Sequence, residues 1–203
     1  MKPKQLEAWQ GEFGEAYTDR NVEDWRTRLP GLTPIVEGVP VHSVLEVGCN
    51  RGHNLVAFSE LLGLEAEIVG IEPNRHAREI ARTSSNRIAV LEGSAFELPF
   101  KDGYFDLVFT SGVLIHISLA DLPKALAEIH RVSRRYILAM EYFAEEETVI
   151  PYRGREDLLW KRNFLKHYQT QFPGLKVVRE GFLGLEEGWD RQTWWLLEKP
   201  AQD

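Results

Sequence analysis

Short apolar runs alternate with amphipathic stretches along most of the chain. The first five runs are separated by segments that can be helices, as the crossovers between parallel strands require. No crossover helix fits between the last two runs, so these are predicted to form an antiparallel hairpin. The seven predicted strands are residues 43–48, 67–72, 88–93, 105–112, 135–143, 176–183 and 193–199.

Three of the intervening segments have the apolar spacing of helices. Residues 53–63 carry apolar side chains at helical spacing and end on a glycine, and residues 74–84 and 118–133 are also predicted helices. Pro123 places the start of the third helix close to itself, because proline is tolerated in a first helical turn and not in a helix interior. Alternating strands and helices predict an α/β sheet.

The chain has 203 residues, 43% of them hydrophobic, which fits one globular domain spanning residues 1–203. Two segments are not needed to complete the sheet. Ligands of open α/β sheets bind at the carboxyl ends of the strands, where such segments are natural covers. We therefore expect an N-terminal helical lid (1–41), a cofactor-binding half (42–143), a substrate-side insertion (144–175) and a C-terminal strand hairpin (176–203).

Composition excludes several classes of function. The net charge of -7 disfavours a broad phosphate-binding face, so no nucleic acid partner is expected. The N-terminus lacks a signal-peptide pattern and no long apolar run occurs, which predicts a soluble, cytoplasmic protein without membrane contact. Cys49 is the only cysteine, so no internal disulfide or cysteine-based zinc site can form. No compact cluster of histidines and carboxylates indicates a metal.

The stretch LEVGCNRGHN, residues 45–54, is a predicted strand that ends in a glycine loop before a helix. Such a loop directs free N–H groups toward an anionic ligand. The spacing does not fit the dinucleotide or phosphate-loop fingerprints. It fits E-x-G-x-x-x-G, with Glu46, Gly48 and Gly52, and a carboxylate there opposes a pyrophosphate but suits an ammonium or sulfonium group. Glu72 ends the second predicted strand, where it can accept both hydroxyls of a ribose.

In their order and spacing these motifs resemble the class I S-adenosylmethionine-dependent methyltransferases across nearly the whole chain. The resemblance implies a Rossmann-like, seven-stranded, mostly parallel sheet with helices on both faces and a C-terminal antiparallel hairpin. It also implies S-adenosyl-L-methionine as cofactor, with its methionine part at Glu46, Gly48 and Gly52 and its ribose at Glu72. The other residues that this resemblance and the loop and lid positions assign to the cofactor are Tyr17, Arg20, Cys49, Asn50, Pro73, Ser94, Ala95, Phe96, Ser111, Gly112 and Val113.

Two positions differ from the family pattern. The family often has aspartate where Ser94 stands, which alters the expected contact to the adenine amino group. Asn50 occupies the position of a middle glycine, but asparagine tolerates a left-handed backbone, so the loop shape can survive. Whether the Asn50 side chain also contacts the cofactor is left open by the sequence.

A narrower resemblance rests on WQGEFGEAYTDRN, residues 9–21, together with the glycine loop. These segments resemble the pseudaminic acid biosynthesis-associated methylases, which implies O- or N-methylation of a sugar or nucleotide-linked sugar, a small-molecule acceptor. The alternatives are methylation of RNA, protein or another metabolite, or a non-catalytic cofactor-binding partner in a biosynthetic complex. A monomer or homodimer is expected.

Direct methyl transfer needs no covalent enzyme intermediate, and it needs a base only if the acceptor arrives protonated. His116 lies just past the fourth predicted strand and Glu141 near the end of the fifth, and both are candidate catalytic bases; Glu141 is alternatively a group that binds an amino group. The plain alternative for His116 is a histidine at a helix start or core edge. In the lid, Tyr17 and Arg20 are expected to close over the cofactor, with Arg20 on its carboxylate. The candidate substrate-binding residues are Trp9, Asn21, Tyr152 and Arg153.

Overall fold

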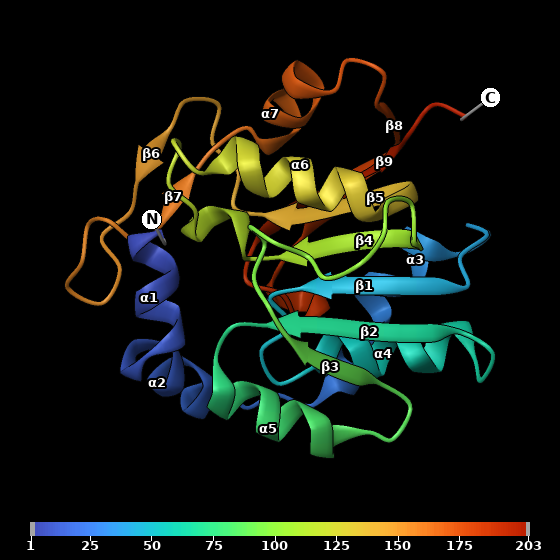
Figure 1. Ribbon diagram of the computed structural model, residues 1–203, viewed down its shortest axis with the longest axis horizontal. Coiled ribbons are helices and arrows are strands. Elements are labelled where there is room, and N and C mark those ends of the chain that lie inside the picture. The colour runs from blue at the N-terminus through green and yellow to red at the C-terminus, as the bar shows by residue number, and fades with distance from the viewer. Residues whose placement is uncertain (1–2, 202–203) are drawn as a thin grey trace.

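The computed structural model describes residues 3–201 and contains a seven-stranded sheet of order β3-β2-β1-β4-β5-β9-β8 (Figure 1). The first five strands along the chain are parallel, and β9 runs antiparallel between β5 and β8. All seven predicted strands are confirmed to within two residues at each end. Their bounds are β1 Ser43–Val47, β2 Glu67–Glu72, β3 Ala89–Glu92, β4 Phe105–Ser111, β5 Ser133–Glu141, β8 Lys176–Leu183 and β9 Gln192–Glu198.

Helices cover both faces of the sheet, as predicted. The helices α3 (Leu29–Val36), α4 (His53–Leu62) and α5 (Arg75–Ser84) pack with one set of strand side chains into a single apolar cluster. The helices α6 (Leu122–Val132) and α7 (Phe164–Gln171) pack with the alternate set on the other face. This follows from the two-residue period of a strand, which sends successive side chains to opposite faces.

The crossover from β3 to β4 contains no helix, contrary to the expectation that each of these crossovers is helical. Residues 93–104 form a loop that lies against α6. Glu128 accepts a hydrogen bond from the Leu98 N–H at 2.8 Å, and Arg131 donates to the Leu98 carbonyl at 2.9 Å. Because these side chains satisfy the backbone of the loop, the segment can cross the sheet without helical hydrogen bonds.

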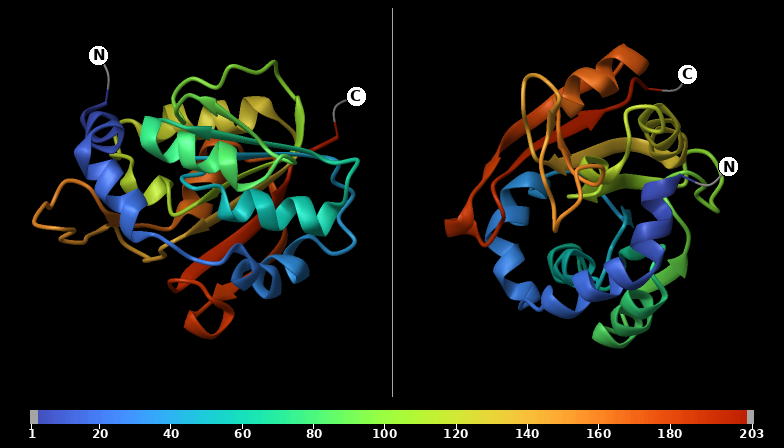
Figure 2. Two further views of the ribbon diagram at one scale, coloured as in Figure 1. Left: turned by 90° about the horizontal axis from the view of Figure 1, so that it is seen from below. Right: turned by 90° about the vertical axis from the view of Figure 1, so that its left-hand side faces the viewer.

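The N-terminal segment lies over the carboxyl ends of the parallel strands, at the left of Figure 1 and facing the viewer in Figure 2, right. It consists of α1 (Lys4–Gln10), α2 (Glu12–Arg20) and the 3₁₀ turn η1 (Trp25–Arg28), which lead into α3. The chain breaks between α1 and α2 at Gly11. The aromatic side chains still meet, with the Trp9 ring 5.2 Å from that of Phe13 and 5.2 Å from that of Tyr17.

The insertion lies beside this lid. It contains a two-stranded sheet of β6 (Thr148–Val149) and β7 (Trp160–Lys161), which the sequence did not predict, followed by α7. The tip of this hairpin contacts α1, where Lys4 pairs with Asp157 at 2.8 Å (Figure 1). The loops after β4 and β8 carry the short 3₁₀ turns η2 (Leu114–His116) and η3 (Leu185–Glu187). No helix within residues 3–201 is both long and apolar enough to cross a membrane.

Gly14 sets how closely the lid approaches the rest of the fold. A Cβ atom at Gly14 would lie 1.9 Å from the Trp9 carbonyl oxygen and 2.8 Å from Asn74 Nδ2. We expect Gly14→Ala to lower the free energy of unfolding by about 2 kcal/mol, because neither backbone nor buried amide can move freely away. Thermal unfolding followed by circular dichroism measures this as a fall in melting temperature of about 4–8 °C.

The matched control is Gly11→Ala at the break between α1 and α2. A Cβ atom there has its nearest neighbour, the Glu7 carbonyl oxygen, at an ordinary 3.6 Å. This variant should melt close to the unaltered protein. Equal melting temperatures for the Gly14→Ala and Gly11→Ala proteins would contradict the packing described for the lid.

Candidate functional site

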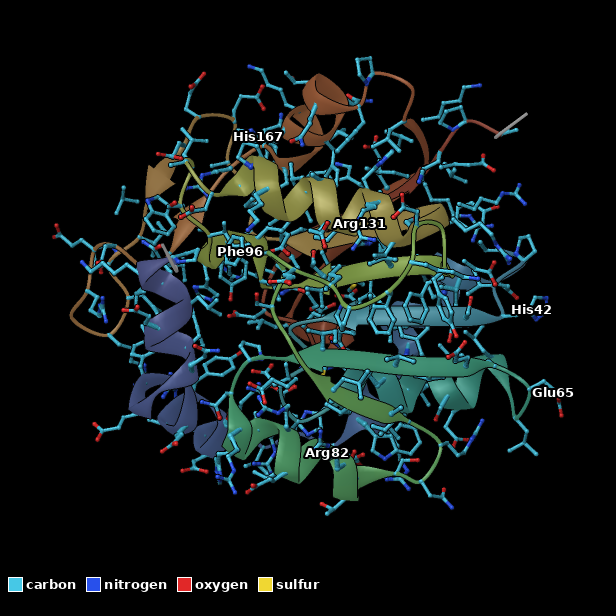
Figure 3. The ribbon with its side chains drawn as sticks, in the orientation of Figure 1. His42, Glu65, Arg82, Phe96, Arg131 and His167 are labelled. Carbon is cyan, nitrogen blue, oxygen red and sulfur yellow. The ribbon has the colours of Figure 1, made fainter. Side chains whose placement is uncertain are left out.

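A cavity of about 1230 Å³ opens at the carboxyl edge of the sheet, beneath α1 and α2. Figure 3 shows the labelled Phe96 at this edge, whereas His42 and Glu65 lie at the opposite edge. All but two of the site residues predicted from the sequence line the cavity, the exceptions being Gly52 and Glu141. The predicted residues that line it are Trp9, Tyr17, Arg20, Asn21, Glu46, Gly48, Cys49, Asn50, Glu72, Pro73, Ser94, Ala95, Phe96, Ser111, Gly112, Val113, His116, Tyr152 and Arg153.

The glycine loop between β1 and α4 depends on left-handed backbone at three positions. Gly48, Asn50 and Gly52 have φ values of 80°, 45° and 77°. Asparagine therefore does adopt the left-handed conformation that its position requires. Its side chain turns toward the lid, where Nδ2 donates to Thr18 Oγ1 at 3.0 Å. Gly48 is also constrained by space, since a Cβ atom there would lie 2.6 Å from a Val113 methyl carbon.

Glu46 is a buried carboxylate on the wall of the cavity. Its Oε1 accepts a hydrogen bond from Asn54 Nδ2 at 2.7 Å, and its Oε2 has no hydrogen-bond partner. Burial raises the pKa of Glu46 to about 8, while the Asn54 hydrogen bond and the Arg28 guanidinium lower it. A buried acceptor without a donor is costly, so this oxygen fits a ligand that brings a positively charged donor such as an ammonium group.

Glu72 stands at the end of the adjacent strand, on the same cavity. Its two oxygens accept the backbone N–H groups of Asn50 and Asn74, each at 2.8 Å. Burial raises the pKa of Glu72 to about 7, against the lowering effect of these hydrogen bonds. A carboxylate oxygen accepts more than one hydrogen bond, so both oxygens remain able to accept from the hydroxyls of a ribose.

The remaining predicted cofactor residues line the cavity on the loops that follow β3 and β4. Ser94 Oγ accepts weakly from the Phe96 N–H at 3.4 Å. After β4, Ser111 Oγ donates to Gln192 Oε1 at 3.2 Å, and Gly112 has a φ of 64°. Cys49 also lines the cavity, and burial raises the pKa of its thiol well above the ordinary value, so the thiolate is disfavoured.

His116 lies in η2 at the cavity wall, with one ring nitrogen free to accept a proton. Its Nδ1 is 2.5 Å from the Leu158 carbonyl oxygen, which can only accept, so the proton is on Nδ1 and Nε2 carries a lone pair. Burial lowers the pKa of His116 to about 4 despite this hydrogen bond, so the ring is neutral. The Trp9 and Tyr152 rings lie 4.5 Å and 5.8 Å away.

Glu141 does not reach the cavity, which corrects its predicted position as a base or substrate contact. It is fully buried below η2, and its oxygens accept the backbone N–H groups of Val113, Leu114 and Ile115 at 3.2, 3.1 and 3.3 Å. Burial raises the pKa of Glu141 to about 7, and these N–H groups lower it. Its carboxylate therefore holds the loop that carries His116 and does not face an acceptor.

Arg20 lies on the side of the cavity that faces the insertion. Its guanidinium carbon is 5.2 Å from the Tyr17 ring centre, and its Nη2 is 3.5 Å from the Tyr152 hydroxyl. Burial raises the pKa of Tyr17 to about 12, with a further contribution from Tyr152. Arg153, beside Tyr152, has a left-handed backbone with a φ of 54°.

Sequence analysis missed Arg28, which lies at the methionine side of the cavity. Its Nη1 donates to the Gly188 carbonyl at 2.7 Å, it pairs with Glu23, and its buried Nε has no partner. Burial is the largest cause that lowers the pKa of His53, and the charge of Arg28 is the second largest. Arginines in a polar segment carry no positional signal, so the sequence gives no means of choosing Arg28.

Two asparagines were also missed, although each lies next to a predicted motif. Asn54 holds Glu46, and Asn74 caps α5 by accepting the Ala77 N–H at 3.1 Å. Asn74 Nδ2 also donates to the Trp9 carbonyl at 3.0 Å, which joins the cap to the lid. The position of Asn74 immediately before a predicted helix was a usable capping signal.

The middle of the chain is similar in sequence to known proteins. Residues 44–135 match the family described as a methyltransferase domain. An uncharacterised methyltransferase of Schizosaccharomyces pombe is 31% identical over 149 residues, which are 66% of this chain and 52% of that protein. A demethylmenaquinone methyltransferase of Staphylococcus aureus is 31% identical over 111 residues, 53% of this chain and 44% of that protein. The chain thus spans about half the length of these relatives.

Solved structures share the fold. The 1,6-didemethyltoxoflavin-N1-methyltransferase of Burkholderia thailandensis, with bound 1,6-didemethyltoxoflavin and S-adenosylhomocysteine, has a TM-score of 0.67 to this chain at 15% identity. The superposition covers 97% of this chain and 86% of that one. Residues 44–135 thus match a methyltransferase domain, and the glycine loop and the two carboxylates near the ends of β1 and β2 lie within the matched residues.

Proposed function

We propose that this protein transfers a methyl group from S-adenosylmethionine to a small molecule, by O- or N-methylation of a sugar or nucleotide-linked sugar. The observation that carries the methyl-transfer proposal is the unpartnered Oε2 of buried Glu46 on the cavity wall, beside a left-handed glycine loop. The resemblance of residues 9–21 to pseudaminic acid biosynthesis-associated methylases supports the sugar-linked acceptor. The alternatives that remain are RNA, protein or another metabolite as acceptor, or a non-catalytic partner.

When bound, S-adenosylmethionine supplies an electrophilic methyl group on its sulfonium. In our proposal Glu46 accepts hydrogen bonds from the cofactor's ammonium group, and Glu72 accepts from its ribose hydroxyls. Arg28 binds the cofactor's carboxylate through its free Nε, in place of Arg20, because Arg28 acts on Glu46 and His53 while Arg20 faces Tyr152. Ser94, Ala95 and Phe96 border the adenine.

The lid excludes water from the reaction, because it is tied to both cofactor-binding loops. Asn50 donates to Thr18, Arg51 Nη1 donates to the Thr18 carbonyl at 3.2 Å, and Asn74 donates to the Trp9 carbonyl. These hydrogen bonds hold α1 and α2 over the cavity. A dry, closed site aligns the acceptor with the methyl group and strengthens the electrostatic contacts to it.

His116 Nε2 accepts the proton of the attacking hydroxyl or amine. Its neutral state and its tautomer are both set by the protein, through burial and through the Leu158 carbonyl. Glu141 is a positioning residue, since it holds η2 and thereby the imidazole. Because Trp9 packs against His116, the lid also contributes to the orientation of the ring.

The acceptor is identified by a transfer screen with isotopically labelled S-adenosylmethionine over nucleotide sugars, free sugars, quinone precursors and RNA. Transfer to a sugar or nucleotide-linked sugar is expected. If RNA or a quinone precursor is labelled instead, the proposed acceptor class is wrong, but the proposal that the protein transfers a methyl group still holds. Binding of the cofactor without transfer to any acceptor, including a lysate of metabolites and macromolecules, would favour a non-catalytic role.

We expect cofactor binding to change the protonation of Glu46. Because the pKa of Glu46 in the free protein is about 8, the carboxyl is mostly protonated at pH 7. An adjacent ammonium group lowers that pKa, so S-adenosylhomocysteine binding should release protons at pH 7, and its affinity should rise between about pH 6 and 8. Calorimetry in two buffers of different ionisation enthalpy measures the release.

Glu46→Gln keeps the shape and removes the titration, so the proton release should fall and the affinity should weaken at least about tenfold. Glu72→Ala should weaken binding by about 10- to 100-fold through loss of the ribose contacts. Glu65→Gln, at the opposite edge of the sheet (Figure 3), is the control and should bind like the unaltered protein. Unchanged affinity in both Glu46→Gln and Glu72→Ala would refute the proposed cofactor site.

We expect methyl transfer to the acceptor found in the screen to depend on His116. Because the pKa of His116 is lowered to about 4, the ring is already neutral at pH 6, and turnover should not change with its ionisation between pH 6 and 8. His116→Ala should lower turnover by about 100-fold or more. The residual turnover of that variant should rise with pH, as hydroxide replaces the base.

The control for this prediction is His42→Ala, a histidine at the opposite edge of the sheet that should leave turnover unchanged (Figure 3). Circular dichroism and cofactor affinity report whether the variant keeps its fold. A His116→Ala protein with normal cofactor affinity and normal turnover across this pH range would show that no base acts at this position.

A further inference from the structure

Four cationic side chains line the part of the cavity that faces the insertion and the loop between β8 and β9. None of them forms an ion pair with a residue in the described part of the chain, where most other arginines near the surface do. We call this set the basic rim. Its members are Arg20, Arg153, Lys161 and Arg191.

Contacts between neighbouring side chains bring the rim together from four separate segments. Arg20 reaches the hydroxyl of Tyr152, which precedes Arg153. Lys161 Nζ lies 5.8 Å from the centre of the Tyr142 ring. Tyr142 in turn donates to Asp190, the residue before Arg191. Arg20 and Lys161 therefore each lie against one of two tyrosines, and Arg153 and Arg191 each follow a residue that takes part in these contacts.

Tyr17, Tyr142 and Tyr152 all line the same cavity. Burial, its hydrogen bond to Asp190 and the charge of Asp190 raise the pKa of Tyr142, and Tyr17 and Tyr152 add to the shift. Tyrosine hydroxyls donate hydrogen bonds to anions as well as accepting them. Asp190 accepts the Tyr142 hydroxyl, and its single negative charge does not neutralise the four cations of the rim.

Residues with a left-handed backbone also lie at this cavity. Within residues 3–201 the non-glycine residues with positive φ are Asn50, Arg153 and Arg191, at 45°, 54° and 55°. All three line the cavity. Arginine rarely adopts the left-handed region, and such residues concentrate at ligand clamps. Arg153 adopts it in the two-residue turn that the backbone hydrogen bonds between Tyr152 and Arg155 close, and this turn places Arg153 at the cavity.

We propose that the basic rim binds an anionic group of the methyl acceptor, either a carboxylate or a phosphate. This inference rests on the proposed function for the identity of the ligand as the acceptor, and it narrows the acceptor class to acids and phosphorylated molecules. Tyr152 touches both Arg20 and the His116 ring, so an anion at the rim brings a neighbouring hydroxyl or amine of the same molecule toward the His116 side.

The experiment is calorimetric titration of the full chain with inorganic phosphate and, separately, with acetate, at low ionic strength. Each titration is done on the free protein and on protein saturated with S-adenosylhomocysteine. At least one anion should bind one site in both states and should weaken as salt rises. The anion that binds more tightly distinguishes a phosphate acceptor from a carboxylate acceptor.

The test variant is Arg153→Asn/Arg191→Asn, because asparagine tolerates the left-handed backbone at both positions. Anion affinity should fall at least tenfold, with S-adenosylhomocysteine affinity unchanged. The control Lys124→Gln/Lys176→Gln removes the same charge from exposed side chains outside the cavity and should bind anion normally. It separates a local contact from an effect of net charge.

Two results would overturn the proposal: no binding of either anion by the unaltered protein, or equal loss of binding in the test and control variants. Displacement of S-adenosylhomocysteine by phosphate would also count against it, since the anion would then occupy the cofactor's site. Failure of S-adenosylhomocysteine to bind is a separate result that contradicts the proposed function, and the titration of the free protein still tests the rim.

Discussion

The structure of the site depends on the burial of two carboxylates at the ends of neighbouring parallel strands. Glu46 and Glu72 lie on adjacent strands whose register pairs Glu46 with Gly70. Two buried carboxylates so close must be satisfied by donors from elsewhere in the chain, because neither can reach bulk water. Those donors are Asn54 at the start of α4, the Asn50 N–H in the glycine loop and the Asn74 N–H before α5. The carboxylates therefore hold the glycine loop and the starts of α4 and α5 around the cavity.

The same donors connect the sheet to the lid. Asn50 and Asn74 each give a backbone N–H to Glu72 and a side-chain amide to the N-terminal helices, at Thr18 and at the Trp9 carbonyl. A change in the position of Glu72 is thus transmitted to α1 and α2 through two residues. Ligand that binds Glu72 and stabilises its ionised form strengthens both N–H bonds, because hydrogen bonds to a charged acceptor are stronger than those to a neutral one. A ligand at Glu72 is in this way connected to α1 and α2 by a short series of hydrogen bonds.

The fold could be predicted from the sequence because it follows from local patterns. Strand periodicity gave all seven strands of the sheet, and E-x-G-x-x-x-G with the later Glu72 located the cavity wall. The helix expected between β3 and β4 was wrong because charged side chains of α6 replace its backbone hydrogen bonds, a long-range effect that periodicity does not contain. Glu141 was misplaced for a related reason: a carboxylate at a strand end looks the same whether it faces a ligand or accepts the N–H groups of a nearby loop. Arg28 could not be chosen, since only the fold brings it to Glu46.

The distribution of charge divides the cavity into two halves, one lined by carboxyl groups and the other by cations. In the cofactor half, burial raises the pKa values of Glu46 and Glu72, so the free protein holds carboxyl groups that become fully ionised only beside a cationic ligand. In the other half, the cations of the basic rim form no ion pair within residues 3–201, and we propose that they bind an anion. His116 lies at the boundary, kept neutral by burial and oriented by the Leu158 carbonyl. If the acceptor is acidic, as we propose, exchanging it with the cofactor would set the sulfonium and ammonium groups against the cations of the basic rim and leave Glu46 and Glu72 without a cationic partner, which favours one relative orientation.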